Sequence, residues 1–209
     1  MRYRLAIFDF DGTLADSFPW FSRVVNDVAD RYRFKRIEPH EFDLLRTMDA
    51  RTLMRRQGVA PWKIPFIANH VRRRKAKELD QTRLFDGVGD MLARLSDAEI
   101  KLALVSSNSE PNIRAILGVE MAQRFHYYEC GASLFGKAAR FGKVLARSAT
   151  AASDAICIGD EIRDLEAARR QSIAFGAVTW GYTAPDALIA RSPDMVFRSV
   201  GEIAARLVS

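Results

Sequence analysis

The sequence is poor in the residues that mark several classes of protein. Its 209 residues include only two cysteines and no CxxC pair, so neither a disulfide framework nor a cysteine-based zinc site is expected. With 12 glycines and 7 prolines, the composition is not that of a fibrous or broadly disordered chain. No stretch approaches the roughly 20 apolar residues that a membrane-spanning helix needs.

The N-terminal segment also lacks the features of a secretory signal. Its short apolar run meets Asp9 without a longer apolar stretch or a small-residue cleavage site. We therefore expect a cytoplasmic protein in a reducing setting, with no membrane partner. A length of 209 residues suffices for one ordinary domain, or for a core domain that carries a smaller insert.

Positive charge is concentrated in one part of the chain. The net charge is +6, from 32 Lys and Arg against 26 Asp and Glu. Residues 16–84 hold 16 Lys and Arg against 9 Asp and Glu, which gives this segment a net charge of +7. Such a segment fits an anionic small molecule as well as a polynucleotide. No groove-reading motif accompanies it, and this disfavours nucleic acid as the partner.

Short apolar runs alternate with helical patterns along most of the chain. The runs that indicate strands are residues 5–8, 101–105, 155–158 and 174–178, with weaker or shorter ones at 125–129 and 195–197. The helical patterns lie at residues 88–95, 112–117, 138–147 and 165–170. This alternation is typical of a parallel sheet covered on both faces. We predict an α/β fold with a Rossmann-like core.

The segment from residue 16 to 84 breaks the alternation. Apolar residues such as Phe18, Phe21, Val25 and Val28 recur there at helical spacing, and no clear strand is visible. The simplest interpretation is a helical cap at residues 16–84, inserted into a core formed by residues 1–15 and 85–209.

The strongest chemical signal is the sequence from Asp9 to Thr13, directly after the first strand. Asp9 and Asp11 follow the carboxyl end of that strand, where open α/β sheets place their ligands. Gly12 permits the tight turn that leaves the strand. Such a pair of carboxylates could bind Mg²⁺, or supply a nucleophile and a proton donor. The alternative is a strand end that two aspartates merely cap.

The segment Asp9-Phe10-Asp11-Gly12-Thr13 resembles the first motif of the haloacid dehalogenase-like superfamily, most of whose members are phosphatases. The other motifs follow in order along the whole chain. Residues 102–106, an apolar strand ending in Ser106, resemble the second motif, and Lys137 resembles the lysine of the third. Residues 158–164, with Asp160 and Asp164, are similar to the fourth. The nearest branch is the phosphoglycolate phosphatase-like one, which carries a helical cap.

The resemblance implies a mechanism. Asp9 would attack the phosphorus of a bound phosphomonoester and form an aspartyl-phosphate. Asp11 would protonate the leaving oxygen and later deprotonate water. Mg²⁺ would be held by Asp9, by the main-chain carbonyl of Asp11 and by Asp160, with Asp164 supporting the metal shell or the lysine.

The same resemblance assigns the phosphoryl contacts. Ser106 and Lys137 would stabilise the phosphoryl oxygens, and further substrate contacts would come from Gly12, Thr13, Ser107 and Asn108. Ser106 could instead cap the following turn, and its neighbour Ser107 or Asn108 could then make the phosphoryl contact. Lys143 is the alternative to Lys137, which we prefer because it follows a glycine where a helix is expected to start.

In the expected cap, Arg46 is our candidate for contact with an anionic leaving group, because it precedes a predicted loop. The basic run at residues 72–77 fits a solvated helix face better than a binding site. The presence of Asp11 disfavours carbon–halogen cleavage, because the dehalogenases of the superfamily lack this aspartate.

We therefore predict a Mg²⁺-dependent phosphatase that acts on a small phosphorylated metabolite, with phosphoglycolate as one candidate. A phosphomutase would share the same motifs, and retention of the phosphoryl group would depend on how well the cap excludes water. The remaining alternatives are a basic nucleic-acid-binding protein and a non-catalytic protein that binds phosphate compounds. Both a monomer and a homodimer are compatible with the sequence.

Overall fold

A parallel sheet forms the centre of the computed structural model, which describes residues 3–131 and 136–208. Within these residues the sheet has six strands in the order β5-β4-β1-β6-β7-β8, and every neighbouring pair is parallel. The strands are β1 (Leu5–Phe8), β4 (Lys101–Val105), β5 (Phe125–Glu129), β6 (Ala155–Gly159), β7 (Ala174–Val178) and β8 (Met195–Phe197). The predicted α/β fold and all six predicted strands are confirmed.

Both faces of the sheet are buried, as expected for an all-parallel arrangement. Successive residues of β1 point to opposite faces. Phe8 joins an apolar cluster with α5 (Val88–Asp97), α6 (Glu110–Gln123) and α10 (Val200–Leu207). Ile7 joins a second cluster on the other face, with α7 (Lys137–Ser148), α8 (Ile162–Arg170) and α9 (Pro185–Ile189). The sheet and these helices are called the core below.

Helices α6, α7 and α8 begin earlier than the apolar patterns suggest, whereas α5 begins at Val88 as predicted. Helix α6 starts at Glu110, because the Ser109 side chain accepts a hydrogen bond from the Asn112 amide and caps the helix. Helix α8 starts at Ile162, where the side chains of Glu161 and Asp164 form a reciprocal capping box. The capping residues are polar, so an apolar periodicity does not mark them.

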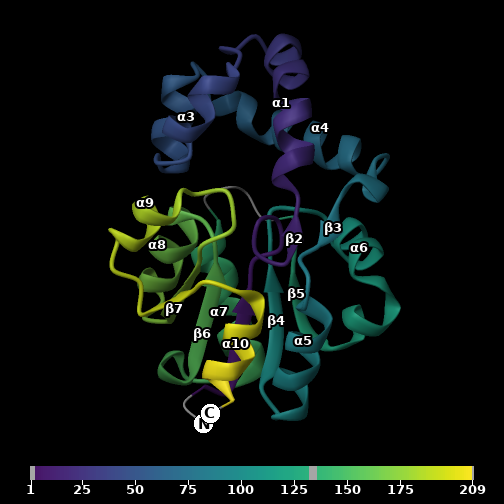
Figure 1. The fold of residues 1–209 in the computed structure, drawn as a ribbon, viewed down its shortest axis with the longest axis vertical. Helices are drawn as coiled ribbons and strands as arrows, with labels where there is room; N and C mark the ends of the chain where they lie inside the picture. Colours follow the sequence, from purple (N-terminus) through teal and green to yellow (C-terminus); the bar gives the residue numbers. More distant parts are fainter. Residues whose placement is uncertain (1–2, 132–135, 209) are drawn as a thin grey trace.

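Between β1 and α5 the chain forms a group of helices beyond the carboxyl ends of the strands (Figure 1). We call residues 16–84 the insert. Its α-helices are α1 (Phe18–Tyr32), α2 (Phe42–Leu45), α3 (Ala50–Arg56) and α4 (Ile64–Lys75), and its 3-10 turns are Pro39–Glu41, Pro61–Lys63 and Leu79–Gln81. A small apolar cluster of its own includes Val25, Ile37 and Leu45.

A short ribbon joins the insert to the core. Strand β2 (Ala15–Asp16) pairs antiparallel with β3 (Arg83–Leu84), so both ends of the insert leave the core side by side. The expectation that the insert has no strand is wrong at its two ends. Two-residue strands carry too few side chains to produce an alternating pattern.

None of the helices in the described ranges combines the length and the apolar character needed to cross a bilayer.

Candidate active site

Three of the predicted site residues follow neighbouring strands at the same edge of the sheet. Asp9 follows β1, Ser106 follows β4 and Asp160 follows β6, and these strands are adjacent. All three residues are buried. The carboxyl ends of parallel strands therefore bring together residues that are about 150 positions apart in the chain.

A buried acidic cluster lies at this edge. Asp9, Asp160 and Asp164 each offer one carboxylate oxygen within 4.8 Å of the others. Burial raises the pKa of Asp160 well above its usual value, and the neighbouring carboxylates raise it further. Burial also raises the pKa of Asp9, although Lys137 opposes the shift. Oxygen atoms so arranged fit a hard divalent cation, which would relieve the repulsion between them.

Lys137 is buried at the start of α7 and joins two of these carboxylates. Its Nζ lies 2.6 Å from Asp9 Oδ2 and 2.5 Å from Asp164 Oδ1. Burial alone would lower the pKa of this lysine, but the two carboxylates outweigh burial and raise it. Lys137 therefore stays cationic. The alternative lysine, Lys143, is exposed on the same helix and is not part of this group.

Asp160 is held from two sides. The Thr13 hydroxyl donates to Asp160 Oδ1 at 2.7 Å, and the Tyr182 amide donates to Oδ2 at 2.7 Å. Gly12 and Gly181 permit this close packing. A Cβ on Gly12, which has φ of +81°, would lie 2.3 Å from Asp160 Oδ2, and a Cβ on Gly181 would lie 2.1 Å from Asp160 Cβ. Neither position accommodates a side chain without a shift of the loop.

Asp11 contacts both the core and the insert. Asn108 Nδ2 donates to Asp11 Oδ2 at 3.0 Å, and Lys75 Nζ donates to Asp11 Oδ1 at 2.5 Å. Lys75 belongs to α4 of the insert, and its Nζ also lies 4.9 Å from the centre of the Trp20 ring. The side chain of Asp11 is 25% exposed, so water still reaches this carboxylate.

The position of Lys75 corrects one expectation. The run at residues 72–77 was expected to be a solvated helix face, but Lys75 is only 3% exposed. A signal for this burial is present in the sequence. Ile67 and Val71 line the apolar side of α4, and Lys75 follows Val71 by four residues, on the same face of the helix.

The loop after β4 is tied to the site and to the insert. Ser106 Oγ accepts a hydrogen bond from the Asn108 amide at 3.2 Å, which is the turn-capping contact considered above as an alternative. The Ser107 carbonyl accepts from Arg72 Nη1 of α4 at 3.2 Å. Arg72 is thus a second member of the basic run that contacts the core.

Arg46 contacts the main chain of the loop after β7. Its Nη2 donates to the Gly181 carbonyl at 2.9 Å, and its Nε donates to the Tyr182 carbonyl at 3.0 Å. The Ala184 amide donates to the Arg46 carbonyl at 2.8 Å, so the contact runs in both directions. The guanidinium also lies 5.0 Å from the centre of the Phe18 ring. Arg46 therefore fastens the insert to the core.

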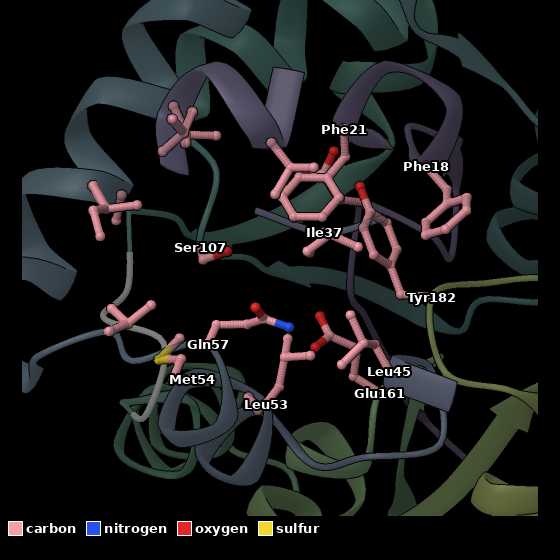
Figure 2. Close-up of a pocket in the computed structure, with 18 of the residues that line it drawn as sticks. Phe18, Phe21, Ile37, Leu45, Leu53, Met54, Gln57, Ser107, Glu161 and Tyr182 are labelled. Atoms are coloured by element: carbon pink, nitrogen blue, oxygen red, sulfur yellow. The ribbon is translucent and has the colours of Figure 1, made fainter. Parts of the chain in front are cut away.

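A cavity of about 320 Å³ lies between the insert and this edge of the sheet. Asp11, Ser107 and Asn108 line it on the side of the core. Most of the remaining wall comes from apolar side chains of the insert (Figure 2), among them Phe18, Phe21, Val25, Ile37, Leu45, Leu53 and Met54. A bound molecule would meet the polar groups at one end and the apolar wall at the other.

Comparisons with known proteins agree with the four motifs. A family model described as haloacid dehalogenase-like hydrolase matches residues 6–178. A curated relative named phosphoglycolate phosphatase, from Synechococcus elongatus, is 33% identical over 198 residues, which cover 94% of this chain and 93% of the relative. A relative named tyrosine-protein kinase PtkA, from Mycobacterium tuberculosis, is 28% identical and covers 88% of this chain and 64% of its own length.

A solved structure from Lactobacillus plantarum shows the same fold. Its TM-score is 0.83 at 22% identity, and the match covers 98% of this chain and 99% of that chain. The family model spans most of the chain, and the first of these relatives is similar over nearly all of it. The chain therefore belongs to the haloacid dehalogenase-like hydrolases and is a phosphatase of that family.

Proposed function

We propose that the protein hydrolyses a small phosphomonoester through an aspartyl-phosphate on Asp9, with Mg²⁺ as cofactor. The observation that carries the proposal is the buried group of Asp9, Lys137, Asp160 and Asp164 at the carboxyl edge of the sheet. An Asp9 oxygen would attack phosphorus while the bond from phosphorus to the leaving oxygen breaks. Water would then release phosphate and regenerate the carboxylate.

The metal would be held by Asp9, Asp160 and the main-chain carbonyl of Asp11, with Asp164 close by. Bound Mg²⁺ supplies positive charge that offsets the repulsion between carboxylate and phosphate. Asp164 Oδ1 already accepts from Lys137, and Asp164 Oδ2 accepts from the Glu161 amide at 3.3 Å. These contacts support a role for Asp164 in holding the lysine.

Asp11 would handle the protons. It would protonate the leaving oxygen as the aspartyl-phosphate forms, and then take a proton from the attacking water. Asn108 and Lys75 hold its two oxygens in the present arrangement. Lys137 and Ser106 would contact the phosphoryl oxygens, together with Gly12, Thr13 and Ser107, as charge develops there.

The insert, which comprises residues 16–84, would act as a cap over the active site. Residues 1–15 and 85–209 would form the catalytic core. The contacts of the insert through Lys75, Arg72 and Arg46 support a closed position that keeps bulk water from the phosphoryl end. The name of the Synechococcus relative makes phosphoglycolate the first compound to assay. A cytoplasmic setting is part of the same proposal.

The test is phosphate release from a panel of phosphorylated metabolites, with Mg²⁺ or with EDTA. We expect release that EDTA abolishes and that falls at least a thousandfold in Asp9→Asn, since the nucleophile is lost. Circular dichroism of the variant checks that it remains folded. Undiminished activity of Asp9→Asn would contradict the assignment of Asp9 as the nucleophile. Transfer of the phosphoryl group to a second site of the substrate, without release, would indicate a phosphomutase.

A further inference from the structure

The walls of the cavity indicate which leaving group the enzyme accepts. At one end lie Asp11 and Asn108, where the phosphoryl group would be bound. The rest of the space is enclosed by the insert and is mostly apolar (Figure 2). The leaving group of a phosphomonoester bound at Asp9 must occupy this space, because the insert covers the carboxyl edge of the sheet.

The cationic side chains that line the cavity are already engaged. Arg46 donates to two carbonyls of the loop after β7, and Arg72 donates to the Ser107 carbonyl. Arg163 is paired with Glu161, whose carboxylate belongs to the same wall. A carboxylate on the leaving group would therefore enter a space where Asp11 and Glu161 repel it and where the arginines are already held by main-chain carbonyls or by Glu161.

The net positive charge of the insert is directed elsewhere. Within the insert, all of which the structure describes, Arg46 and Arg72 are the basic residues that line the cavity, whereas Arg33, Arg55 and Lys77 are exposed and do not line it. Most basic residues of the insert thus lie outside the cavity and do not face a bound substrate.

Gln57, at the end of α3, is the exception in the apolar wall. Its side chain is only 3% exposed, and Figure 2 shows its amide pointing into the cavity. Neither the amide oxygen nor the amide nitrogen has a hydrogen-bond partner among the described residues. An amide buried in this way is costly unless a ligand supplies the missing hydrogen bonds.

We propose that the preferred substrate is a phosphomonoester with an uncharged, largely apolar leaving group that bears a carboxamide or lactam edge for Gln57. An amide presents one donor and one acceptor, so it pairs with the complementary donor and acceptor of another amide. The inference rests on the proposed function, because the phosphoryl group must lie at Asp9. Selectivity would then come from two features of the cavity: its apolar wall and the hydrogen bonds of the Gln57 amide.

Three matched compounds test the proposal: benzyl phosphate, 4-carbamoylbenzyl phosphate and 4-carboxybenzyl phosphate. Their leaving groups are alike in size and differ in the remote substituent. We expect kcat/KM for the carbamoyl compound to exceed that for benzyl phosphate by about tenfold, the worth of a hydrogen bond in a buried site. The carboxy compound should be the poorest of the three. A preference for the carboxy compound, or for phosphoglycolate over all three, would overturn the proposal.

The variant Gln57→Met keeps the side-chain length and removes both amide atoms. It should bring kcat/KM for the carbamoyl and benzyl compounds to within about twofold of each other. Gln123→Met, on an exposed glutamine at the end of α6, is the matched control and should keep the wild-type preference. An unchanged preference in Gln57→Met would contradict the role of Gln57.

Calorimetry with benzamide separates this inference from the proposed function. Benzamide carries no phosphate, so its binding does not depend on turnover. We expect it to bind the wild-type enzyme about tenfold more tightly than it binds Gln57→Met. Absence of phosphate release from every compound would reject the proposed function, while equal benzamide affinity in both proteins would reject the inference about Gln57.

Discussion

Two buried lysines of this protein pair with carboxylates that belong to other elements. Lys137 joins Asp9 to Asp164 within the core, and Lys75 of the insert joins Asp11. Removing one member of such a pair leaves the other without compensation, which is why single substitutions are informative here. The partners of the two lysines differ in exposure. Asp11, the partner of Lys75, is partly exposed, whereas Asp9 and Asp164, the partners of Lys137, are buried.

The variant Lys75→Met tests the contact between the insert and Asp11. It retains an apolar side chain of similar length and removes the ammonium, which contacts both Asp11 and the Trp20 ring. We expect kcat/KM to fall by about 10- to 100-fold, because Asp11 loses a partner that orients it. Steady-state kinetics with benzyl phosphate measure the effect. Lys77→Met, at an exposed position two residues further on, should change little, and an equal loss in both variants would argue against the contact.

The aspartates of the site could be predicted from the sequence, whereas Lys75 was missed and Gln57 could not be predicted. Asp9 and Asp160 each follow an apolar run, and strand ends of a parallel sheet share an edge. Lys75 stands in a basic run that resembles solvated surface, although it lies four residues after Val71. Gln57 is a single amide outside any motif, and only the folded insert brings it into an apolar wall.

At the scale of elements, the loop after β7 is the most constrained part of the site. Gly181 packs against Asp160, and the next residue, Tyr182, donates its amide to the same carboxylate. Nothing in its composition predicts that it touches a residue of the loop after β6.

The variant Gly181→Ala should displace this loop. The new Cβ would lie 2.1 Å from Asp160 Cβ, and the nearby atoms belong to a fully buried side chain that cannot move aside. We expect activity to fall at least tenfold and the Mg²⁺ concentration for half-maximal activity to rise. Gly201→Ala on α10 is the control, because its Cβ would meet nothing within 4 Å. Wild-type metal titration in Gly181→Ala would contradict the assigned role of the loop.

Glu129 at the end of β5 connects the sheet to α7. It accepts hydrogen bonds from Arg140 at 2.7 Å and Arg147 at 3.1 Å. Burial alone would raise the pKa of Glu129, but the two guanidinium groups outweigh burial and lower it from its usual value. The pairing therefore stabilises the fold above the unfolded-state pKa, and this stability is lost as the pH falls through the folded-state pKa.

The variant Glu129→Gln should lower the free energy of unfolding by about 1 kcal/mol at neutral pH. The difference from the wild type should vanish at a pH below the folded-state pKa of Glu129, where both side chains are uncharged. Urea unfolding at the two pH values measures it. Glu120→Gln is the control, since that side chain is 86% exposed. A difference that persists at low pH would show that charge is not the cause.

The elements themselves were largely predictable, and the exceptions have physical reasons. Six apolar runs became strands because a parallel sheet buries both faces of each strand. The ribbon of β2 and β3 was missed because two residues show no alternation. The starts of α6 and α8 were missed because polar caps define them.

At the scale of the whole molecule, the net charge of the insert does not by itself locate an anion site. A net charge of +7 suggested an anion-binding cap, but composition does not say which face each side chain occupies. In the folded chain, Arg46 and Arg72 bind main-chain carbonyls and Lys75 binds a carboxylate of the core. The basic residues that reach the site therefore hold the insert against the core.

The variant Arg46→Met tests this view of the insert. The sequence alone led us to expect a larger effect on anionic substrates than on neutral ones. The contacts with Gly181 and Tyr182 now predict a fall in kcat/KM by the same factor, about tenfold, for phosphoglycolate and for benzyl phosphate. Arg55→Met, at an exposed position of α3, is the control. A fall in kcat/KM confined to phosphoglycolate would instead support direct contact between Arg46 and the carboxylate of that substrate.

The loop after β7 has one further consequence. It touches Asp160 through the Tyr182 amide, and it touches the insert through Arg46 and the Ala184 amide. The proposed cation at Asp160 and a docked insert would thus stabilise the same conformation of one loop. Thermodynamic linkage then requires that docking of the insert raises the metal affinity by the same factor by which the metal raises the docking equilibrium constant. Chelation of the metal should then loosen the insert, and a variant of the β2–β3 ribbon that loosens the insert should weaken metal affinity.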